Sequence, residues 1–262
     1  MVSKSILKLI KSLQQKKYRK KYKLFLVEGS KNVLELLSTS YSIRTLIMTP
    51  VFSEKHQEIL NISNIIEVIL TDEKNLSSIS SFKNNNAAVA IVEIPEALPD
   101  QSREEDYVLA LDDVKDPGNF GTILRIADWY GIHQIICSPE TTDLYNPKVI
   151  SASMGSFLRV NICYMALDLF FKENHKPVYG AYADAGTNVH TIKFSKSGVI
   201  LMGSESHGIH PRYSPFVNYK VNIPAYGQAE SLNVSIATSI ICDNMRRSIT
   251  NQDSALHSQN IN

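Results

Sequence analysis

Short apolar runs alternate with amphipathic segments along the chain, which is the pattern of strands alternating with helices. In the first part of the chain, runs rich in Ile and Val predict strands at 24–27, 44–48, 65–70 and 87–94. Helical spacing lies between them at 31–37, 54–60 and 72–82. Ahead of these, residues 1–23 carry one apolar stripe at helical spacing. The pattern predicts a helix followed by a small α/β unit.

The alternation resumes in the second part of the chain. Strands are predicted at 107–111, 134–137, 158–163, 178–183, 198–202 and 219–221. Helices are predicted at 119–130, 147–154, 167–173 and 232–248. Because strands and helices alternate, we expect a mostly parallel sheet whose faces are covered by helices.

A polar stretch with prolines and four acids separates the two parts and is typical of a linker. We therefore expect an N-terminal α/β domain at 1–97, a linker at 98–106, a second domain at 107–249 and a polar tail at 250–262.

The chain is close to neutral as a whole but has one strongly basic segment. The formal net charge of +1 argues against a protein that coats nucleic acid without specificity. Residues 1–23 nevertheless hold nine Lys or Arg and no acid. Their cluster consists of Lys16, Lys17, Arg19, Lys20, Lys21 and Lys23. This cluster is suited to RNA phosphates, and a solvated helix face is the alternative interpretation.

The cysteines predict neither a disulfide scaffold nor a metal site. Cys137, Cys163 and Cys242 are far apart, form no CxxC pair and lie in apolar runs typical of buried thiols. No apolar run approaches the length of a membrane span, and nothing resembles a signal peptide. We expect a cytoplasmic protein without metal or membrane partners.

Three loops that follow predicted strands carry the candidate chemistry, because open α/β sheets bind ligands at the carboxyl ends of their strands. In the first loop, Gly118 and Gly121 allow a tight turn, Asn119 is suited to cap the next helix, and Arg125 lies within that helix. The second, 201–209, places glycines around Glu205. The third, 223–235, runs into Ser231, a natural N-cap. For the first two loops, an ordinary surface turn is the alternative.

Together the loops resemble the three signature motifs of the SpoU/TrmH family of RNA methyltransferases. The matching patterns are Asn119-x-Gly121-x-x-x-Arg125, Gly203-Ser204-Glu205-x-x-Gly208 and Ile223-Pro224…Gly227…Ser231-Leu232-Asn233-Val234. The resemblance covers about 107–249. Residues 25–29, Phe-Leu-Val-Glu-Gly, also look like the start of the RNA-binding domain of rRNA-modifying members. Two departures are Ser206, where many relatives have Gly, and a last helix without the usual Tyr-Glu.

The resemblance implies a fold, a cofactor and a partner. The fold is of the SPOUT type, a parallel-sheet domain with a deep trefoil knot that forms the pocket for S-adenosyl-L-methionine. The cofactor-binding residues it implies are Met202, Gly203, Ile223, Pro224, Gly227 and Leu232, with Ile223 and Leu232 placed to sandwich adenine. It also implies a homodimer through this domain.

The implied catalytic residues are Asn119, Arg125, Glu205, Ser231 and Asn233, with Arg125 acting from the other subunit. The implied reaction is methylation of a ribose 2′-hydroxyl in RNA. Because a guanidinium stays protonated, we expect Arg125 to hold an RNA phosphate and stabilise the developing alkoxide rather than act as a base.

The N-terminal domain favours large-subunit rRNA as the substrate, with tRNA as the alternative. A non-catalytic ribosome-assembly factor of the same fold is the second alternative, disfavoured because every motif residue is present. A dehydrogenase or kinase is excluded by the absence of the sequences GxGxxG and GxxxxGK[ST].

Overall fold

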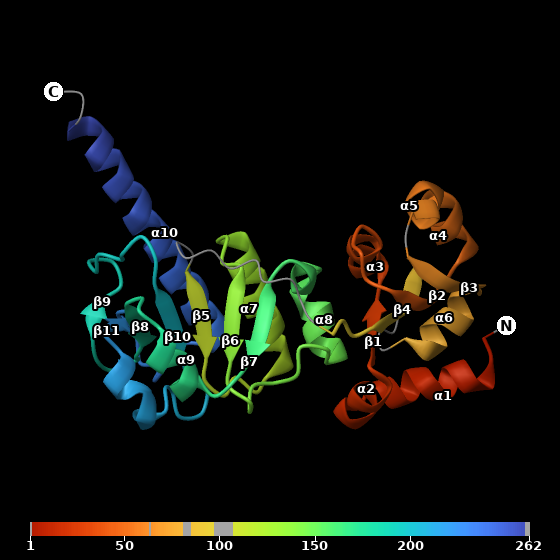
Figure 1. The fold of residues 1–262 in the computed structure, drawn as a ribbon, viewed down its shortest axis with the longest axis horizontal. Coiled ribbons are helices and arrows are strands. Elements are labelled where there is room, and N and C mark those ends of the chain that lie inside the picture. The colour runs from red at the N-terminus through yellow and green to blue at the C-terminus, as the bar shows by residue number, and fades with distance from the viewer. Residues whose placement is uncertain (1, 63, 81–84, 97–106, 260–262) are drawn as a thin grey trace. The chain divides into compact units, whose positions relative to one another are not determined.

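A computed structural model describes residues 2–62, 64–80, 85–96 and 107–259, and its contacts divide the chain into two units (Figure 1). Unit 1 comprises residues 1–98 together with 143–158, and unit 2 comprises 99–142 together with 159–262. The contacts thus group 143–158 with the N-terminal part, although the sequence pattern placed this segment in the second domain. The expected linker at 98–106 lies entirely outside the described residues, and the expected domain boundaries stay a prediction.

Unit 1 is the predicted small α/β unit. Its strands are β1 (Leu24–Glu28), β2 (Ile43–Met48), β3 (Ile65–Leu70) and β4 (Ala88–Glu93), in the order β1-β4-β2-β3. Its helices are α1 (Lys4–Leu13), α2 (Lys16–Tyr22), α3 (Ser30–Leu37), α4 (Pro50–Lys55), α5 (Gln57–Ile62), α6 (Glu73–Ile79) and α8 (Pro147–Ser153), with η1 (Ser156–Leu158). β4 is antiparallel to both β1 and β2, while β2 and β3 are parallel.

Two predicted helices are each divided in the structure. The first becomes α1 and α2, because the backbone is extended at Gln15, with φ −103° and ψ 132°. Arg19 donates from Nη1 to the carbonyl oxygen of Leu13, at the end of α1, at 2.8 Å. The helix predicted at 54–60 is divided at His56 into α4 and α5. Neither break contains a Gly or Pro, and so the sequence pattern did not mark them.

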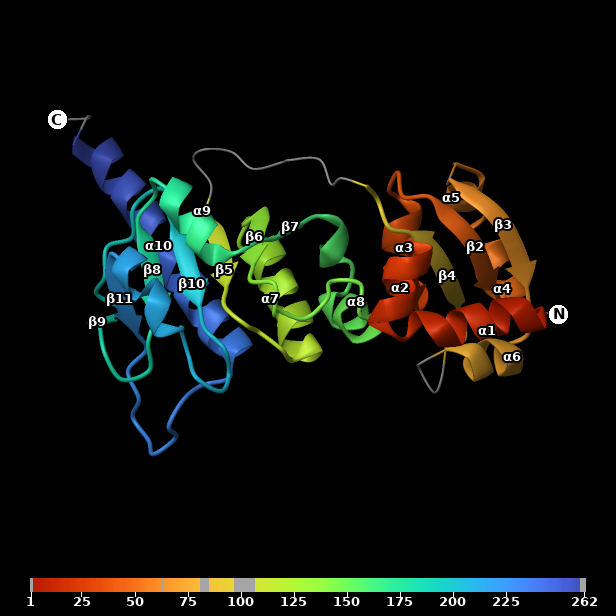
Figure 2. The ribbon, with the colours of Figure 1, turned by 60° about the horizontal axis from the view of Figure 1, so that its bottom comes forward.

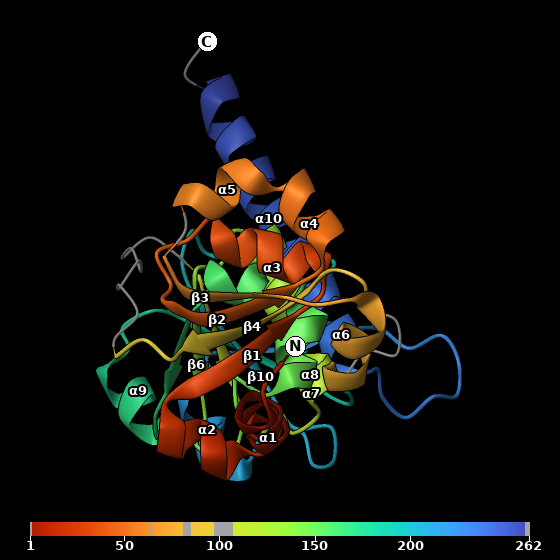
Figure 3. The same ribbon diagram turned by 90° about the vertical axis from the view of Figure 1, so that its right-hand side faces the viewer.

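The sheet of unit 1 is covered on both faces (Figure 3). On one face, Ile10 and Leu13 of α1 and Leu76 of α6 join apolar side chains of β1, β2 and β4 in one buried cluster. The helices α3, α4 and α5 lie on the other face (Figures 1 and 3). Phe25 of β1 packs against Tyr145 with a ring distance of 4.6 Å, which attaches the segment 143–158 to this sheet.

Unit 2 contains the predicted parallel sheet. Its strands are β5 (Val108–Leu111), β6 (Gln134–Cys137), β7 (Asn161–Tyr164), β8 (Val178–Ala181), β9 (Thr187–Asn188), β10 (Val199–Met202) and β11 (Tyr219–Asn222). The order is β7-β6-β5-β10-β8-β11-β9, and all pairs are parallel. The helices are α7 (Pro117–Trp129), α9 (Leu167–Glu173) and α10 (Val234–Gln259), with the 3-10 helix η2 (Pro211–Phe216). Strand pairings do not determine whether the chain passes through a loop. The deep trefoil knot therefore stays a prediction.

Helices cover both faces of this sheet. Leu167 and Phe171 of α9 and Tyr213 of η2 pack with apolar side chains of β5, β8 and β10. The alternate side chains of β5, Leu109 and Leu111, are also fully buried. α7 and α10 contact each other and lie on the face opposite α9 (Figures 1 and 2).

The last helix differs most from its prediction. α10 begins two residues later than expected and continues to Gln259, so much of the expected polar tail is helical. The apolar stripe ends near Ile249, and a polar helix leaves no periodic signal. Arg246 of α10 donates to the carbonyl oxygens of Tyr130 and Gly131 at 2.7 and 3.0 Å, which satisfies the C-terminus of α7.

Candidate active site

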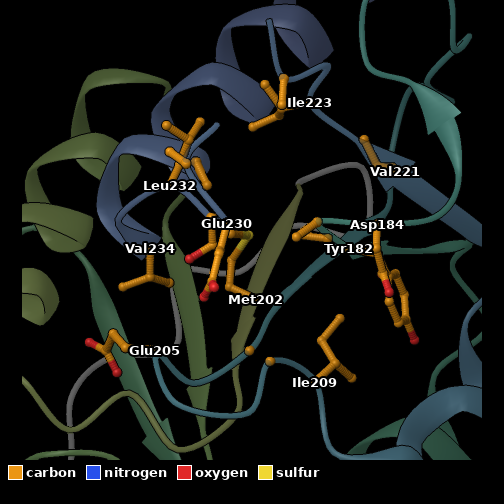
Figure 4. A pocket seen from close by; sticks show the side chains of 18 of the residues that line it. Tyr182, Asp184, Met202, Glu205, Ile209, Val221, Ile223, Glu230, Leu232 and Val234 are labelled. Carbon is orange, nitrogen blue, oxygen red and sulfur yellow. The ribbon is translucent and has the colours of Figure 1, made fainter. Parts of the chain in front are cut away.

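A cavity of about 750 Å³ lies at the carboxyl edge of the parallel sheet in unit 2 (Figure 4). Three segments at the carboxyl ends of neighbouring strands line it: 181–184 at the end of β8, 202–209 at the end of β10, and 223–227 with 229–232 after β11. The long loop after β11 extends away from the sheet (Figure 2), and the first turns of α10 complete the wall. Parallel strands end at one edge, and this brings the three loops together.

The structure brings all six cofactor residues expected from the sequence to this one cavity. They are Met202, Gly203, Ile223, Pro224, Gly227 and Leu232. Glu205 and Ser231 line it as well, whereas Asn119, Arg125 and Asn233 do not.

Gly203 sits where the chain doubles back on itself. A Cβ on this residue would lie 2.1 Å from the carbonyl carbon of Gly208, so any side chain would force the loop open. Ser204 and Gly208 exchange backbone hydrogen bonds at 3.0 and 2.9 Å, and Gly208 has a φ of +67°. Ser206 is not among the positive-φ residues, so a serine in place of the usual glycine fits its backbone without strain.

The ionisable side chains of the cavity are mostly acidic. Asp184, Glu205 and Glu230 are placed around it (Figure 4), His207 also lines it, and no Lys or Arg does among the described residues. Such a lining attracts a cationic ligand and opposes a polyphosphate. The sequence motifs did not identify Asp184 or Glu230. Asp184 follows strand β8, so the rule of strand ends would have found it, whereas Glu230 lies in the third loop, far from the end of β11.

A chain of hydrogen bonds joins one residue from each motif beside the cavity. Asn233 Nδ2 donates to Asn119 Oδ1 at 2.9 Å, and Asn119 Nδ2 donates to Glu205 Oε1 at 2.8 Å. The structure thus brings together three of the five expected catalytic residues.

The helix caps differ from those expected. Asp116, rather than Asn119, caps α7, because its Oδ1 accepts from the backbone nitrogen of Asn119 at 2.7 Å. Asn233, rather than Ser231, stands at the start of α10, where its Oδ1 accepts from the backbone nitrogen of Ser235 at 2.9 Å. Both predictions were wrong because a helix start can shift by a turn among several residues able to cap it.

Capping fixes the direction of the hydrogen-bond chain. The Oδ1 of Asn233 is occupied by the start of α10, and so its Nδ2 is the atom left for Asn119. Asn119 must then accept with its oxygen and donate with its nitrogen to Glu205. Glu205 is thereby held as a carboxylate acceptor at the cavity wall.

Arg125 is not part of this arrangement. It is exposed on α7 and makes no hydrogen bond or ion pair within the described residues. It lies six positions after Asn119, about 240° round the helix axis, and therefore projects from another face of α7. Ser231 lines the cavity and is likewise exposed, without a hydrogen bond inside the described part of the chain.

Two adjacent aspartates that follow β5 stabilise the loops through hydrogen bonds and ion pairs. Asp112 is buried at the end of β5, and its Oδ2 accepts from the backbone nitrogen of His210 at 2.7 Å. Burial raises the pKa of Asp112, while the hydrogen bond from His210 and nearby cationic groups lower it in part. Asp113 has a φ of 60°, and its Oδ2 lies 3.1 Å from the ammonium of Lys115 and 3.4 Å from Nε2 of His207. These contacts tie the first loop to the second.

Two further findings concern the described residues alone. No group of three or more His, Cys, Asp and Glu residues in that part of the chain could hold a metal ion. None of its helices combines the length and apolar character that crossing a membrane requires.

Comparisons with known proteins match both units. The family model of the SpoU rRNA Methylase family matches residues 106–243, and that of the MRM3-like substrate binding domain matches residues 4–90. The chain is 27% identical to the 23S rRNA (guanosine(2553)-2′-O)-methyltransferase RlmP of Bacillus subtilis, over 90% of this chain and 94% of that protein.

Solved structures give the same picture. An AdoMet-bound rRNA methyltransferase from Sinorhizobium meliloti is 31% identical with a TM-score of 0.83, covering 94% of this chain and 97% of the other. A TrmH-family protein from Porphyromonas gingivalis is 34% identical with a TM-score of 0.80, covering 94% and 99%.

Proposed function

Because the chain belongs to the SpoU rRNA Methylase family, we propose that it transfers a methyl group from S-adenosylmethionine to a ribose 2′-hydroxyl of RNA, with large-subunit rRNA as the substrate. The observation that carries the proposal is the acidic cavity beside the chain of Asn233, Asn119 and Glu205. The Bacillus and Sinorhizobium relatives are named as rRNA methyltransferases, which supports the choice of rRNA.

The cavity fits S-adenosylmethionine in size and charge. Its volume of about 750 Å³ is that of a small-molecule site. The ammonium and sulfonium of this cofactor give it a net positive charge, which Asp184, Glu205 and Glu230 favour. Ile223 and Leu232 supply apolar surface for adenine, and the backbone near Gly203 and Gly227 can approach the ligand closely.

When bound, S-adenosylmethionine supplies an electrophilic methyl group. A ribose 2′-hydroxyl is a weak nucleophile, and the protein must align it and favour loss of its proton. Glu205, fixed by Asn119, holds the second loop in place at the cavity wall. Asn233 and Asn119 act as positioning residues because their hydrogen bonds lock the three loops together.

We assign Arg125 the role of a cation that holds the RNA phosphate next to the reacting ribose. There it stabilises the developing alkoxide, and the proton leaves through the phosphate or a water molecule. A literal base is excluded, since the guanidinium stays protonated. Ser231 belongs to the proposed site through its place at the cavity wall.

Arg125 serves the site of a second copy of the chain in this proposal, which requires a homodimer. Its direction on α7, away from Asn119, supports action across an interface. The two contacting helices of this region also leave large apolar side chains exposed, Trp129 on α7 at 84% and Ile236 on α10 at 52%. Exposed apolar surface of this kind is typical of protein interfaces.

Three further expectations are part of the proposal. Unit 1 binds the RNA, supported by its match to a substrate-binding domain. The loop after β11 belongs to a deep trefoil knot, as the family resemblance implies. The protein works in the cytoplasm, supported by three cysteines that all carry free thiols.

The proposal is tested with purified protein, radiolabelled S-adenosylmethionine and total RNA from a strain that lacks the protein. We expect label in large rRNA, at linkages that resist alkaline cleavage because their 2′-oxygen is methylated. Label in tRNA would support the proposed reaction but contradict large rRNA as its substrate. Cofactor binding without any transfer would instead support a ribosome-assembly factor.

A further inference from the structure

The helices α1 and α2 present an exposed lysine surface, here called the α1–α2 face. On α1, Lys4, Lys8 and Lys11 are all exposed and share one stripe, opposite the buried Ile10 and Leu13. The two helices are joined by two residues and lie on the same side of the sheet of unit 1 (Figures 1 and 3). The exposed lysines of the face therefore come from two contacting helices that follow each other in the chain.

On α2, one basic side chain anchors the helix and the others face solvent. Arg19 is only 3% exposed and pairs with Asp143, Nη2 to Oδ2 at 2.7 Å, within unit 1. At 100° per residue, Lys17 and Lys21 point about opposite Arg19. Lys16 and Lys20 flank them on one side. The sequence cluster thus separates into a structural arginine and a set of solvent-facing lysines.

Two tyrosines flank the lysines on the other side of α2. Tyr18 and Tyr22 are stacked, with ring centroids 6.1 Å apart and an angle of 14° between the rings. The ammonium of Lys17 lies 5.9 Å from the Tyr18 ring, and that of Lys21 lies 5.4 Å from the Tyr22 ring. Tyr22 is 42% exposed, which leaves part of its ring open to a planar ligand.

The positive charge of the face is not neutralised by the protein. Within the described residues, the lysines of α1 and α2 form no ion pair, and only Lys23, beyond α2, reaches an acid, Glu96, at 3.4 Å. Unpaired lysines beside an open aromatic ring are the combination that binds single-stranded nucleic acid, through phosphate neutralisation and base stacking.

A lipid surface fits this face less well than RNA does. A helix that lies in a membrane interface needs an apolar side opposite its lysines. In α1 that side is buried within unit 1, where Ile10 and Leu13 pack against the sheet. In α2 the opposite side is Arg19, which is held by Asp143.

We propose that the α1–α2 face is an RNA-contacting surface outside the methylation cavity, in which lysines bind phosphates and Tyr22 stacks on an unpaired base. The proposal rests on the proposed function, because it takes the partner to be the RNA substrate. It gives unit 1 a specific way to hold RNA independently of the residues that line the cavity.

The test measures binding of the full-length protein to a fluorescein-labelled RNA stem-loop by anisotropy, over a series of salt concentrations. Lys17→Gln with Lys21→Gln should lower the affinity and reduce the slope of log K against log salt by about one for each lysine. Tyr22→Ala should weaken binding about ten-fold with little change in slope, whereas Tyr22→Phe should bind as the parent does. Thermal unfolding checks that each variant folds.

The matched control is Lys55→Gln with Lys74→Gln, which removes two exposed lysines of the same unit on other helices. Equal losses in the control and in the Lys17/Lys21 variant would overturn the proposal, because the effect would then be one of net charge. Binding of the parent to phosphatidylserine vesicles but not to RNA would also overturn it. Methyl transfer is measured in parallel. If the parent protein binds RNA through this face but transfers no methyl group, the proposed function is refuted and the proposed RNA-contacting surface is not.

Discussion

Asn233 and Asn119 lie 114 positions apart in the chain, and a hydrogen bond of 2.9 Å joins Nδ2 of the first to Oδ1 of the second. Asn233 also stands at the start of α10, while Asn119 passes the bond on to Glu205. One side chain therefore begins a helix and sets the orientation of an amide in another loop. The two roles can be separated by substitution.

Asn233→Asp should retain stability and lose activity. Aspartate caps a helix as well as asparagine does, so the start of α10 is preserved. Its carboxylate cannot donate, so Asn119 must turn its amide round and present oxygen to Glu205, which breaks the chain. We expect kcat/KM for methyl transfer to fall at least about ten-fold, with a melting temperature close to that of the parent.

The comparison for this variant is Asn233→Ala, which loses the cap as well and should cost about 1 kcal/mol of stability. An Asn233→Asp protein with parental activity would show that the direction of the hydrogen bonds does not matter.

Arg125 of one subunit should complete the active site of the other subunit, so two inactive variants should restore activity when mixed. Arg125→Ala alone and Asn233→Ala alone should each be nearly inactive. After mixing with subunit exchange, about a quarter of parental activity should return, since half of the dimers are mixed and each has one complete site. Steady-state methyl transfer measures this, with light scattering to confirm the dimer. No recovery despite proven exchange would place Arg125 in the site of its own subunit.

Gly203→Ala should disrupt the second loop. The new Cβ would meet the backbone of Gly208 at 2.1 Å, and such overpacking costs about 1–3 kcal/mol. We expect a lower melting temperature and at least ten-fold weaker binding of S-adenosylmethionine by calorimetry. Gly227→Ala is the control for stability, because nothing lies within 4 Å of its Cβ position. Equal melting temperatures for the two variants would contradict the close approach.

Asp112→Asn should change how stability depends on pH. Burial raises the pKa of Asp112 above its ordinary value of 3.8. Its stabilising contribution is therefore fully present below about pH 3.8 and lost as the pH rises through the folded-state pKa. Asparagine keeps an oxygen to accept from the backbone nitrogen of His210.

We expect the Asp112→Asn protein to be more stable than the parent at pH 7, with the difference shrinking toward pH 4. Urea unfolding of both proteins across this range measures it. A difference that stays constant with pH would assign the effect to packing rather than to the buried charge.

The element pattern of the fold was largely predictable from periodicity. The strand at 134–137 and the helix at 167–173 appear with the predicted bounds, as β6 and α9. The pattern missed β9, which has only two residues, and η2, whose six residues include Pro211 and Pro215 and are therefore typical of a turn. The end of α10 was missed for the related reason that its last turns are polar.

The candidate site was partly predictable. Motif spacing selected six residues that all line the cavity, because each follows a strand of a parallel sheet and such strands end at one edge. Spacing could not show that Asp184 and Glu230 give the cavity its negative charge, since neither belongs to a recognised pattern.

The sequence by itself determined the local features of this protein: the alternating elements, the positions of the turns and the loops that carry its chemistry. These depend on periodicity and turn residues, which act between near neighbours in the chain. Only the tertiary structure decided the direction of the hydrogen bonds through Asn119, the separation of Arg125 from them, and the burial of Arg19 among exposed lysines. Each of these depends on a partner at least 86 positions away or on a helix face, because hydrogen bonds act over about 3 Å in space whatever the distance along the chain.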